Sequence, residues 1–157
     1  KRFLAISPMP RIDGGLELMT SDGALAARLQ RLVREWPVEF LVRIRGEIGE
    51  PHQAAILRGE LDDGRALAVE SLEGSEEEAE ISNRWYRVRI TGASGKDVRQ
   101  LFERQGALVS RVQRTALGPL ALTRDLNRGQ FRALTSEEAA LLRSSKRVAT
   151  APKTPDR

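Results

Sequence analysis

Arginine is the residue type whose number and placement favour chemistry most in this chain. Lysine and arginine total 26 against 22 acidic residues, so the formal net charge is +4. The acidic residues cluster in 73–80, whereas basic residues fill the second half, as Arg84, Arg87, Arg89, Lys96, Arg99, Arg104, Arg111, Arg114, Arg124, Arg128 and Arg132. A planar guanidinium can contact a phosphate through two hydrogen bonds and can stack on a base. The pattern indicates a surface for nucleic acid, with an ordinary solvated basic face as the alternative.

Motifs for other kinds of chemistry are incomplete. Cysteine is absent, which excludes disulfides, thiolate nucleophiles and cysteine-ligated metal sites. His52 is the single histidine, so neither a histidine metal centre nor a histidine-relayed serine triad can be assembled. Segment 92–96 is similar to part of a phosphate-binding loop, but Asp97 replaces the hydroxyl residue that would bind magnesium. The run 73–80 lacks the ligand spacing of a calcium loop, so we expect no metal site.

The hydrophobic pattern predicts the elements that must position these residues. Strands are expected at 3–6, 16–20, 40–44, 66–69, 85–90, 108–114 and 120–122. Helices are expected at about 23–35, 51–58, 96–105 and 135–142. Segment 70–82, which is acidic and contains glycine and serine, is predicted to be a mobile hairpin loop. Because several consecutive strands are joined by short turns, we predict an α+β fold with a mixed, mostly antiparallel central sheet and flanking helices.

The length and hydrophobic content of the chain predict one domain. A chain of 157 residues, of which 40% are hydrophobic, can bury one core. We expect this domain at 1–143 and a disordered basic tail at 144–157. The chain begins at Lys1, close to an expected strand, so we expect it to be part of a longer polypeptide. No apolar run approaches the roughly 20 residues that span a bilayer, and we expect a cytoplasmic monomer without membrane contact.

Several sequence blocks follow one another in the order and spacing of a known family. In the second half they are 83–91 (Asn-Arg-Trp-Tyr-Arg-Val-Arg-Ile-Thr), 97–106 (Asp-Val-Arg-Gln-Leu-Phe-Glu-Arg-Gln-Gly), 108–120 (Leu-Val-Ser-Arg-Val-Gln-Arg-Thr-Ala-Leu-Gly-Pro-Leu) and 128–135 (Arg-Gly-Gln-Phe-Arg-Ala-Leu-Thr). In the first half they are 1–6, 15–29 and 39–46. With these blocks, the sequence over roughly 1–143 resembles the catalytic domain of RsuA/RluB-like ribosomal RNA pseudouridine synthases.

The resemblance implies an enzyme that needs no cofactor and isomerises a uridine flipped out of ribosomal RNA. In this family an aspartate attacks the ribose anomeric carbon or removes a sugar proton, and the freed uracil turns and rejoins through carbon 5. An arginine pairs with the aspartate, and an aromatic ring stacks on the base. Arg99 and Phe40 match these two positions. Their alternatives are a charge on a helix surface for Arg99 and a core aromatic on an alternating strand for Phe40.

The loop that should carry the aspartate departs from the family pattern Gly-Arg-Leu-Asp. Aligned without gaps from Lys1 to Thr20, the loop is 7–10 (Ser-Pro-Met-Pro), and Pro10 occupies the aspartate position. A second alignment pairs Arg11-Ile12-Asp13 with Arg-Leu-Asp and requires the deletion of three residues before the next strand. Such a deletion moves a carboxylate by several ångströms, enough to disturb catalysis that depends on position. Under this second alignment Asp13 is the candidate nucleophile, with Arg99 or Arg11 as its charge partner.

Three functions remain open from the sequence. The first is an active pseudouridine synthase that uses Asp13, Arg99 and Phe40. The second is a catalytically inactive relative that binds structured RNA, and the third is a protein-interaction module on the same fold. For the first two, the candidate RNA-binding residues are Arg11, Arg43, Lys96, Arg111 and Arg114. Whether the chain is an enzyme depends on the aspartate loop.

Overall fold

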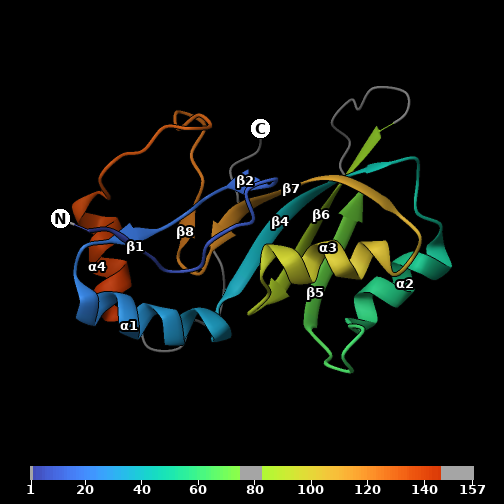
Figure 1. Ribbon diagram of the computed structural model, residues 1–157, viewed down its shortest axis with the longest axis horizontal. Coiled ribbons are helices and arrows are strands. Elements are labelled where there is room, and N and C mark those ends of the chain that lie inside the picture. The colour runs from blue at the N-terminus through green and yellow to red at the C-terminus, as the bar shows by residue number, and fades with distance from the viewer. Residues whose placement is uncertain (1, 75–82, 146–157) are drawn as a thin grey trace.

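The structure is a computed structural model that describes residues 2–74 and 83–145 (Figure 1). In chain order its elements are β1 (Leu4–Ala5), β2 (Gly14–Gly15), β3 (Met19–Thr20), α1 (Gly23–Leu32), the 3-10 helix η1 (Val33–Glu35), β4 (Pro37–Arg45), α2 (Glu50–Arg58), β5 (Ala68–Gly74), β6 (Asn83–Thr91), α3 (Gly95–Glu103), β7 (Leu108–Leu117), β8 (Leu120–Ala121) and α4 (Ser136–Ser144). This arrangement confirms the predicted α+β fold.

The central sheet has the strand order β2-β7-β4-β6-β5, and β8 pairs with β7. Its pairings are antiparallel except that between β2 and β7, which is parallel. The short strands β1 and β3 form a separate antiparallel pair. Figure 1 shows α2 and α3 across one face of the sheet, with α1 and α4 at the other end of the molecule beside β1 and β8. The sheet is therefore mixed and mostly antiparallel, as predicted.

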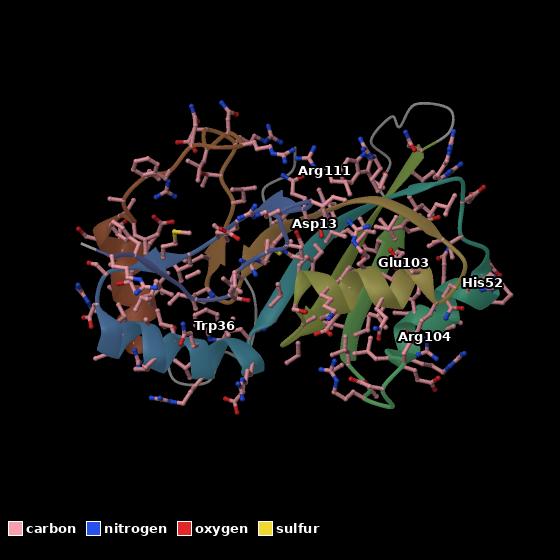
Figure 2. The ribbon with its side chains drawn as sticks, in the orientation of Figure 1. Asp13, Trp36, His52, Glu103, Arg104 and Arg111 are labelled. Carbon is pink, nitrogen blue, oxygen red and sulfur yellow. The ribbon has the colours of Figure 1, made fainter. Side chains whose placement is uncertain are left out.

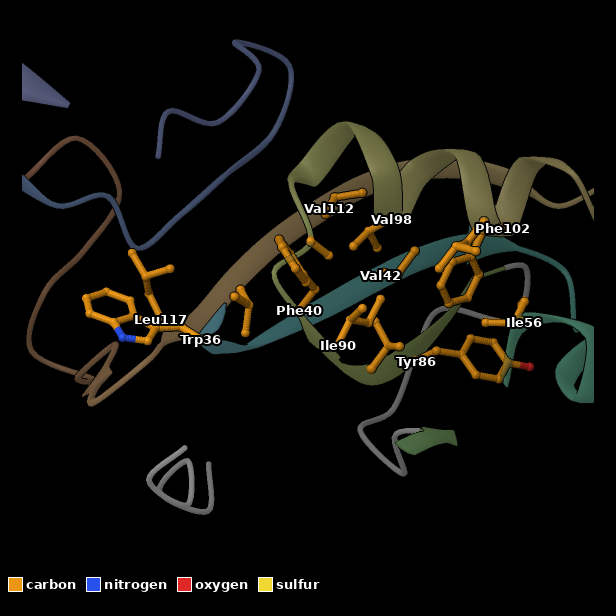
Figure 3. Close-up of a cluster of buried hydrophobic side chains, with 14 of the residues drawn as sticks. Trp36, Phe40, Val42, Ile56, Tyr86, Ile90, Val98, Phe102, Val112 and Leu117 are labelled. Atoms are coloured by element: carbon orange, nitrogen blue, oxygen red, sulfur yellow. The ribbon is translucent and has the colours of Figure 1, made fainter. Parts of the chain in front are cut away.

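Strand β6 shows how the core is built. Tyr86, Val88 and Ile90 are buried, whereas the residues between them are more exposed, because successive side chains of a strand point to opposite faces. The ring centroid of Tyr86 lies 6.2 Å from that of Phe102 on α3. Burial of a large apolar side chain stabilises a fold by about 1.5–3 kcal/mol, so this layer holds α3 firmly on the sheet. Figure 3 shows further members of the layer, among them Phe40, Val42, Ile56, Val98 and Val112.

Helix α3 is fixed at its first residue as well as along its buried face. The Ser94 hydroxyl accepts from the Asp97 backbone N–H at 3.1 Å, and the Asp97 carboxylate accepts from the Ser94 N–H at 3.2 Å. This capping box satisfies two backbone donors at the start of the helix. A Cβ at Gly95 would lie 2.9 Å from the terminal carbon of Met9. Segment 7–13 therefore packs directly against the start of α3.

Two predicted boundaries differ from the structure. The strand expected at 66–69 is β5, which continues to Gly74, so the start of the predicted loop at 70–74 is wrong. The cause is the partner strand, because β6 offers ladder positions for β5 as far as Tyr86. The rest of that loop, 75–82, lies outside the described residues. At the other end Ser144 still belongs to α4, and 146–157 of the predicted tail also lie outside them.

Helices in the described ranges are too short and too polar to span a lipid bilayer.

Candidate active site

Asp13 stands between a tight turn and the edge strand β2. Its backbone N–H donates to the carbonyl oxygen of Pro10 at 3.0 Å, which closes the turn. The next residues, Gly14 and Gly15, pair in parallel with β7. Gly15 has a φ of 105°, and a Cβ there would lie 2.2 Å from the carbonyl oxygen of Arg114. Only glycine allows this approach, so the glycine that follows Asp13 by two residues draws the aspartate against β7.

The Asp13 carboxylate is held through one of its two oxygens. Oδ1 accepts from Nη2 of Arg99 at 2.5 Å and from the backbone N–H of Val112 at 3.1 Å. Arg99 also donates to the carbonyl oxygen of Val109 at 2.9 Å, which ties it to the same strand. The carboxylate side chain has no exposed surface, so the ion pair compensates a charge that would otherwise be costly to bury.

The second oxygen of Asp13, Oδ2, is also buried, and no atom of the described residues hydrogen-bonds to it. Buried polar atoms without a partner are rare in folded proteins, and a catalytic role or contact with a water molecule or ion is among the explanations for one. The carboxylate is thus oriented through Oδ1, while Oδ2 is buried without a hydrogen bond from the described residues.

Asp13 lines a cavity of about 530 Å³ between β2, β7 and the segment that joins β8 to α4. This volume lies within the range of about 300–1,000 Å³ that is typical of small-molecule sites. Figure 2 shows Asp13 and Arg111 close together beside β2, with His52 far away on α2. The walls combine apolar and cationic side chains, among them Met9, Leu18, Leu122, Leu126, Leu134, Phe131, Arg11, Arg111 and Arg128.

Three arginines give the cavity wall a positive charge. Arg11, Arg111 and Arg128 line it, and within 2–74 and 83–145 none of them forms a salt bridge. A fourth, Arg132, is neutralised by Glu138, with contacts of 2.7 and 3.1 Å. The cavity therefore joins a buried carboxylate to cations that are free to bind an anion.

Curated relatives decide the family. The sequence is 36% identical over 129 residues to the ribosomal large subunit pseudouridine synthase B of Pseudomonas aeruginosa, covering 82% of this chain and 33% of that protein. It is 35% identical over 143 residues to the protein of the same name from Salmonella typhimurium, covering 90% of this chain and 48% of that protein. The chain belongs to the RsuA/RluB-like family of pseudouridine synthases. It spans about a third to a half of the length of these relatives.

Solved structures agree on the fold. A crystal structure of pseudouridylate synthase superposes with a TM-score of 0.70 at 21% identity, covering 89% of this chain and 59% of that one. A Cbf5-Nop10-Gar1 complex gives a TM-score of 0.54 at 17% identity, covering 77% of this chain and 42% of that one. No model of a protein family matches the sequence.

Within this member of the pseudouridine synthase family, Arg11 and Arg111 lie on the cavity as candidate RNA contacts. Lys96 is exposed on α3, in a shallow groove that Arg99 also lines. Arg43 lies further along the sheet, with its guanidinium 5.7 Å from the ring centroid of Trp85 and its Nε 2.8 Å from the Ser110 hydroxyl. The strand register places Arg111, Arg43 and Trp85 in one row across β7, β4 and β6. Cations therefore continue from the cavity onto the sheet.

The expectation that Arg114 contacts RNA is wrong. Its side chain is fully buried, and its guanidinium donates to the carbonyl oxygens of Leu16 at 2.7 Å and Ser7 at 2.6 Å. Burial lowers the pKa of Arg114 to about 10, so the group remains charged at neutral pH. The segment from Ser7 to Leu16 folds over this arginine, which satisfies two of the segment's backbone acceptors. No signal in the sequence separates it from the accessible arginines of the same strand.

Phe40 does not occupy the position expected of a stacking ring. Its side chain is completely buried in the core, and it is not part of the cavity wall, because strand alternation in β4 turns it toward the helices. The core-aromatic alternative describes it correctly. Among the described residues that line the cavity, the aromatic one is Phe131, which the sequence reasoning missed. Phe131 lies in the block 128–135 that resembles the family, and this position could have indicated a role at the site.

Proposed function

We propose that this chain is the catalytic part of an RNA pseudouridine synthase, with Asp13 as the nucleophile and Arg99 as its charge partner. One observation carries the proposal. Asp13 lines a cavity with one carboxylate oxygen fixed by Arg99 and Val112 and the other oxygen without a partner among the described residues. The second alignment of the aspartate loop, rather than the one that places Pro10 at the aspartate position, is consistent with this geometry.

The proposed reaction needs no cofactor. Oδ2 attacks carbon 1′ of the ribose or removes a sugar proton, and the bond from carbon 1′ to N1 of uracil breaks. The uracil turns, and the ester bond to Oδ2 breaks as carbon 5 bonds to carbon 1′; in the alternative route the carboxylate returns the sugar proton at this step. The proton on carbon 5 is then lost to solvent, and N1 takes up a proton. Atoms and charge balance, so the product is an isomer. Arg99 fixes the direction of the carboxylate and balances its charge while the base is detached.

Ribosomal RNA is the substrate class we propose, because the curated relatives are named as pseudouridine synthases of the large ribosomal subunit. Arg11, Arg111 and Lys96 would contact phosphates near the cavity, and Arg43 would extend the contact along the sheet. Such a substrate implies a cytoplasmic location. The expected monomeric state stays a prediction, which light scattering can test.

An inactive RNA-binding relative is the second candidate. The observation that favours it is the complete burial of the Asp13 side chain. A ribose can reach Oδ2 only if residues of the cavity wall move apart. A protein-interaction module, the third function left open by the sequence, has less support, because Arg11, Arg111 and Arg128 on the cavity wall have no salt-bridge partners in the described ranges and suit phosphate contacts.

The test is release of tritium from an RNA transcript of the large ribosomal subunit labelled at carbon 5 of uridine. Wild type should release tritium, and Asp13→Asn should release none above background, because the amide is not nucleophilic. Asp63→Asn is a matched control, since Asp63 is an exposed carboxylate outside the cavity. Full activity of Asp13→Asn would refute the proposed nucleophile. Absence of release by wild type, combined with RNA affinity that weakens steeply with salt, would favour the inactive relative.

A further inference from the structure

Phe131 is the most exposed large apolar side chain of the described residues, although it belongs to a cavity wall. It is 95% exposed. An aromatic ring in water loses the stabilisation that burial would give, about 1.5–3 kcal/mol for a side chain of this size. A ring placed at the mouth of a cavity and turned to solvent therefore suggests a ligand that covers it.

The segment that carries Phe131 is well anchored. Arg132, the next residue, makes a two-pronged contact with Glu138 on α4. Hydrogen bonding from Arg132 lowers the pKa of Glu138 to about 2, so this pair is ionised throughout the physiological range. On the other side of the ring, the Gln130 backbone N–H donates to the Asn127 carbonyl oxygen, and the Gln130 side chain accepts from the Asn127 N–H, both at 3.0 Å. The exposed ring is thus presented on a fixed turn.

The charge next to the ring points to the kind of ligand. Arg128 lies in the same turn, lines the same cavity and has no salt bridge within 2–74 and 83–145. An aromatic face with a free guanidinium beside it is the combination that binds single-stranded nucleic acid, by stacking on a base and pairing with its phosphate. A protein ligand would need a larger apolar surface than one ring.

We infer that Phe131 stacks on the nucleobase adjacent to the target uridine, while Arg128 contacts the phosphate between the two nucleotides. The inference rests on the proposed binding of RNA in this cavity. The ring is too exposed to enclose the uridine itself, which must reach the buried Asp13 carboxylate. Phe131 would therefore set the preference for the neighbouring nucleotide.

The experiment measures stacking directly and does not require turnover. A short single-stranded RNA carries one uridine with 2-aminopurine as its neighbour, and the full chain with Asp13→Asn is added. Base stacking on Phe131 should quench the fluorescence. Phe131→Ala in the same background should abolish the quench and weaken binding by about 5- to 100-fold. Phe131→Trp should restore both properties.

Leu108→Ala is the matched control. Leu108 is 66% exposed and does not line the cavity, so its loss should leave the quench and the affinity unchanged. Quenching and affinity that are the same in Phe131→Ala as in the parent would overturn the inference, and so would equal effects of both alanine variants. If tritium is never released but the quench depends on Phe131, the proposed isomerisation fails and the stacking site stands. If tritium is released and the quench is independent of Phe131, the stacking site is refuted and the proposed isomerisation stands.

Discussion

The arginines packed under the aspartate loop stabilise the fold, whereas those around the cavity are available to bind a ligand. Arg99 and Arg114 have partners for their guanidinium groups, a carboxylate for the first and two carbonyl oxygens for the second. Arg11, Arg111 and Arg128 have no salt-bridge partner in the described part of the chain. The same residue type therefore builds the site in one region and is available to bind a ligand in the other. Only burial and hydrogen bonding distinguish the two regions.

Removal of Arg99 should have the largest effect on stability. In Arg99→Ala the buried Asp13 carboxylate loses its counter-charge, and breaking a buried pair in this way costs about 3–5 kcal/mol. The free energy of unfolding in urea is the measurement. Asp13→Asn combined with Arg99→Ala should recover part of the loss, since no uncompensated charge remains. A loss below about 1 kcal/mol in the single variant would mean that the pair does not hold the loop.

Removal of Arg114 should come second. Arg114→Met fills much of the same space but leaves the carbonyl oxygens of Ser7 and Leu16 without their donor, at a cost of about 2–3 kcal/mol. Arg111→Ala, on the same strand, is the control and should change the unfolding free energy by less than about 0.5 kcal/mol. Equal free energies of unfolding for the two variants would mean that Arg114 contributes no more to stability than Arg111 does.

The cavity arginines should show the converse behaviour. Arg11→Ala, Arg111→Ala and Arg128→Ala should each weaken RNA binding and reduce the slope of log affinity against log salt by about one, because each removes one phosphate contact. Fluorescence anisotropy over a series of salt concentrations measures the slope. An unchanged slope in all three variants would contradict an RNA surface here.

The smallest expected effect concerns the turn that carries Phe131. The pKa of Glu138 is lowered to about 2, mainly by hydrogen bonding from Arg132, so its pairing stabilises the fold above its ordinary pKa of 4.5. That contribution should decrease once the pH falls below 4.5 and should be lost by about pH 2. The melting temperature of wild type minus that of Glu138→Gln should therefore be constant from pH 7 to about 5 and should shrink progressively between pH 4.5 and about 2. If the difference in melting temperature vanished near pH 5, the pKa of Glu138 would not be lowered in the folded protein.

The order of the helices and strands could be predicted because it depends on short-range features of the sequence, namely hydrophobic periodicity and capping residues. Alternation in 85–90 and the cap at Thr135 were both sufficient to place β6 and the start of α4. The pairing of Asp13 with Arg99 was reachable through the family resemblance. The burial of Arg114 and Phe40 was not, because it depends on how segment 7–16 folds over β7 and on the face of the sheet to which β4 turns its residues. Both are long-range consequences of packing.

The proposed reaction depends on the exact position of the Asp13 carboxylate, and lengthening this side chain by one carbon probes that dependence. Asp13→Glu keeps the charge but moves the oxygens outward by one methylene. Single-turnover formation of pseudouridine in ribosomal RNA, read by mass spectrometry after chemical labelling of the product, should fall by about 100-fold or more, as expected for a displacement of about 1 Å. RNA affinity should be unchanged. A rate for Asp13→Glu equal to that of wild type would show that Asp13 is not the nucleophile, because a nucleophilic carboxylate must be held closely in position.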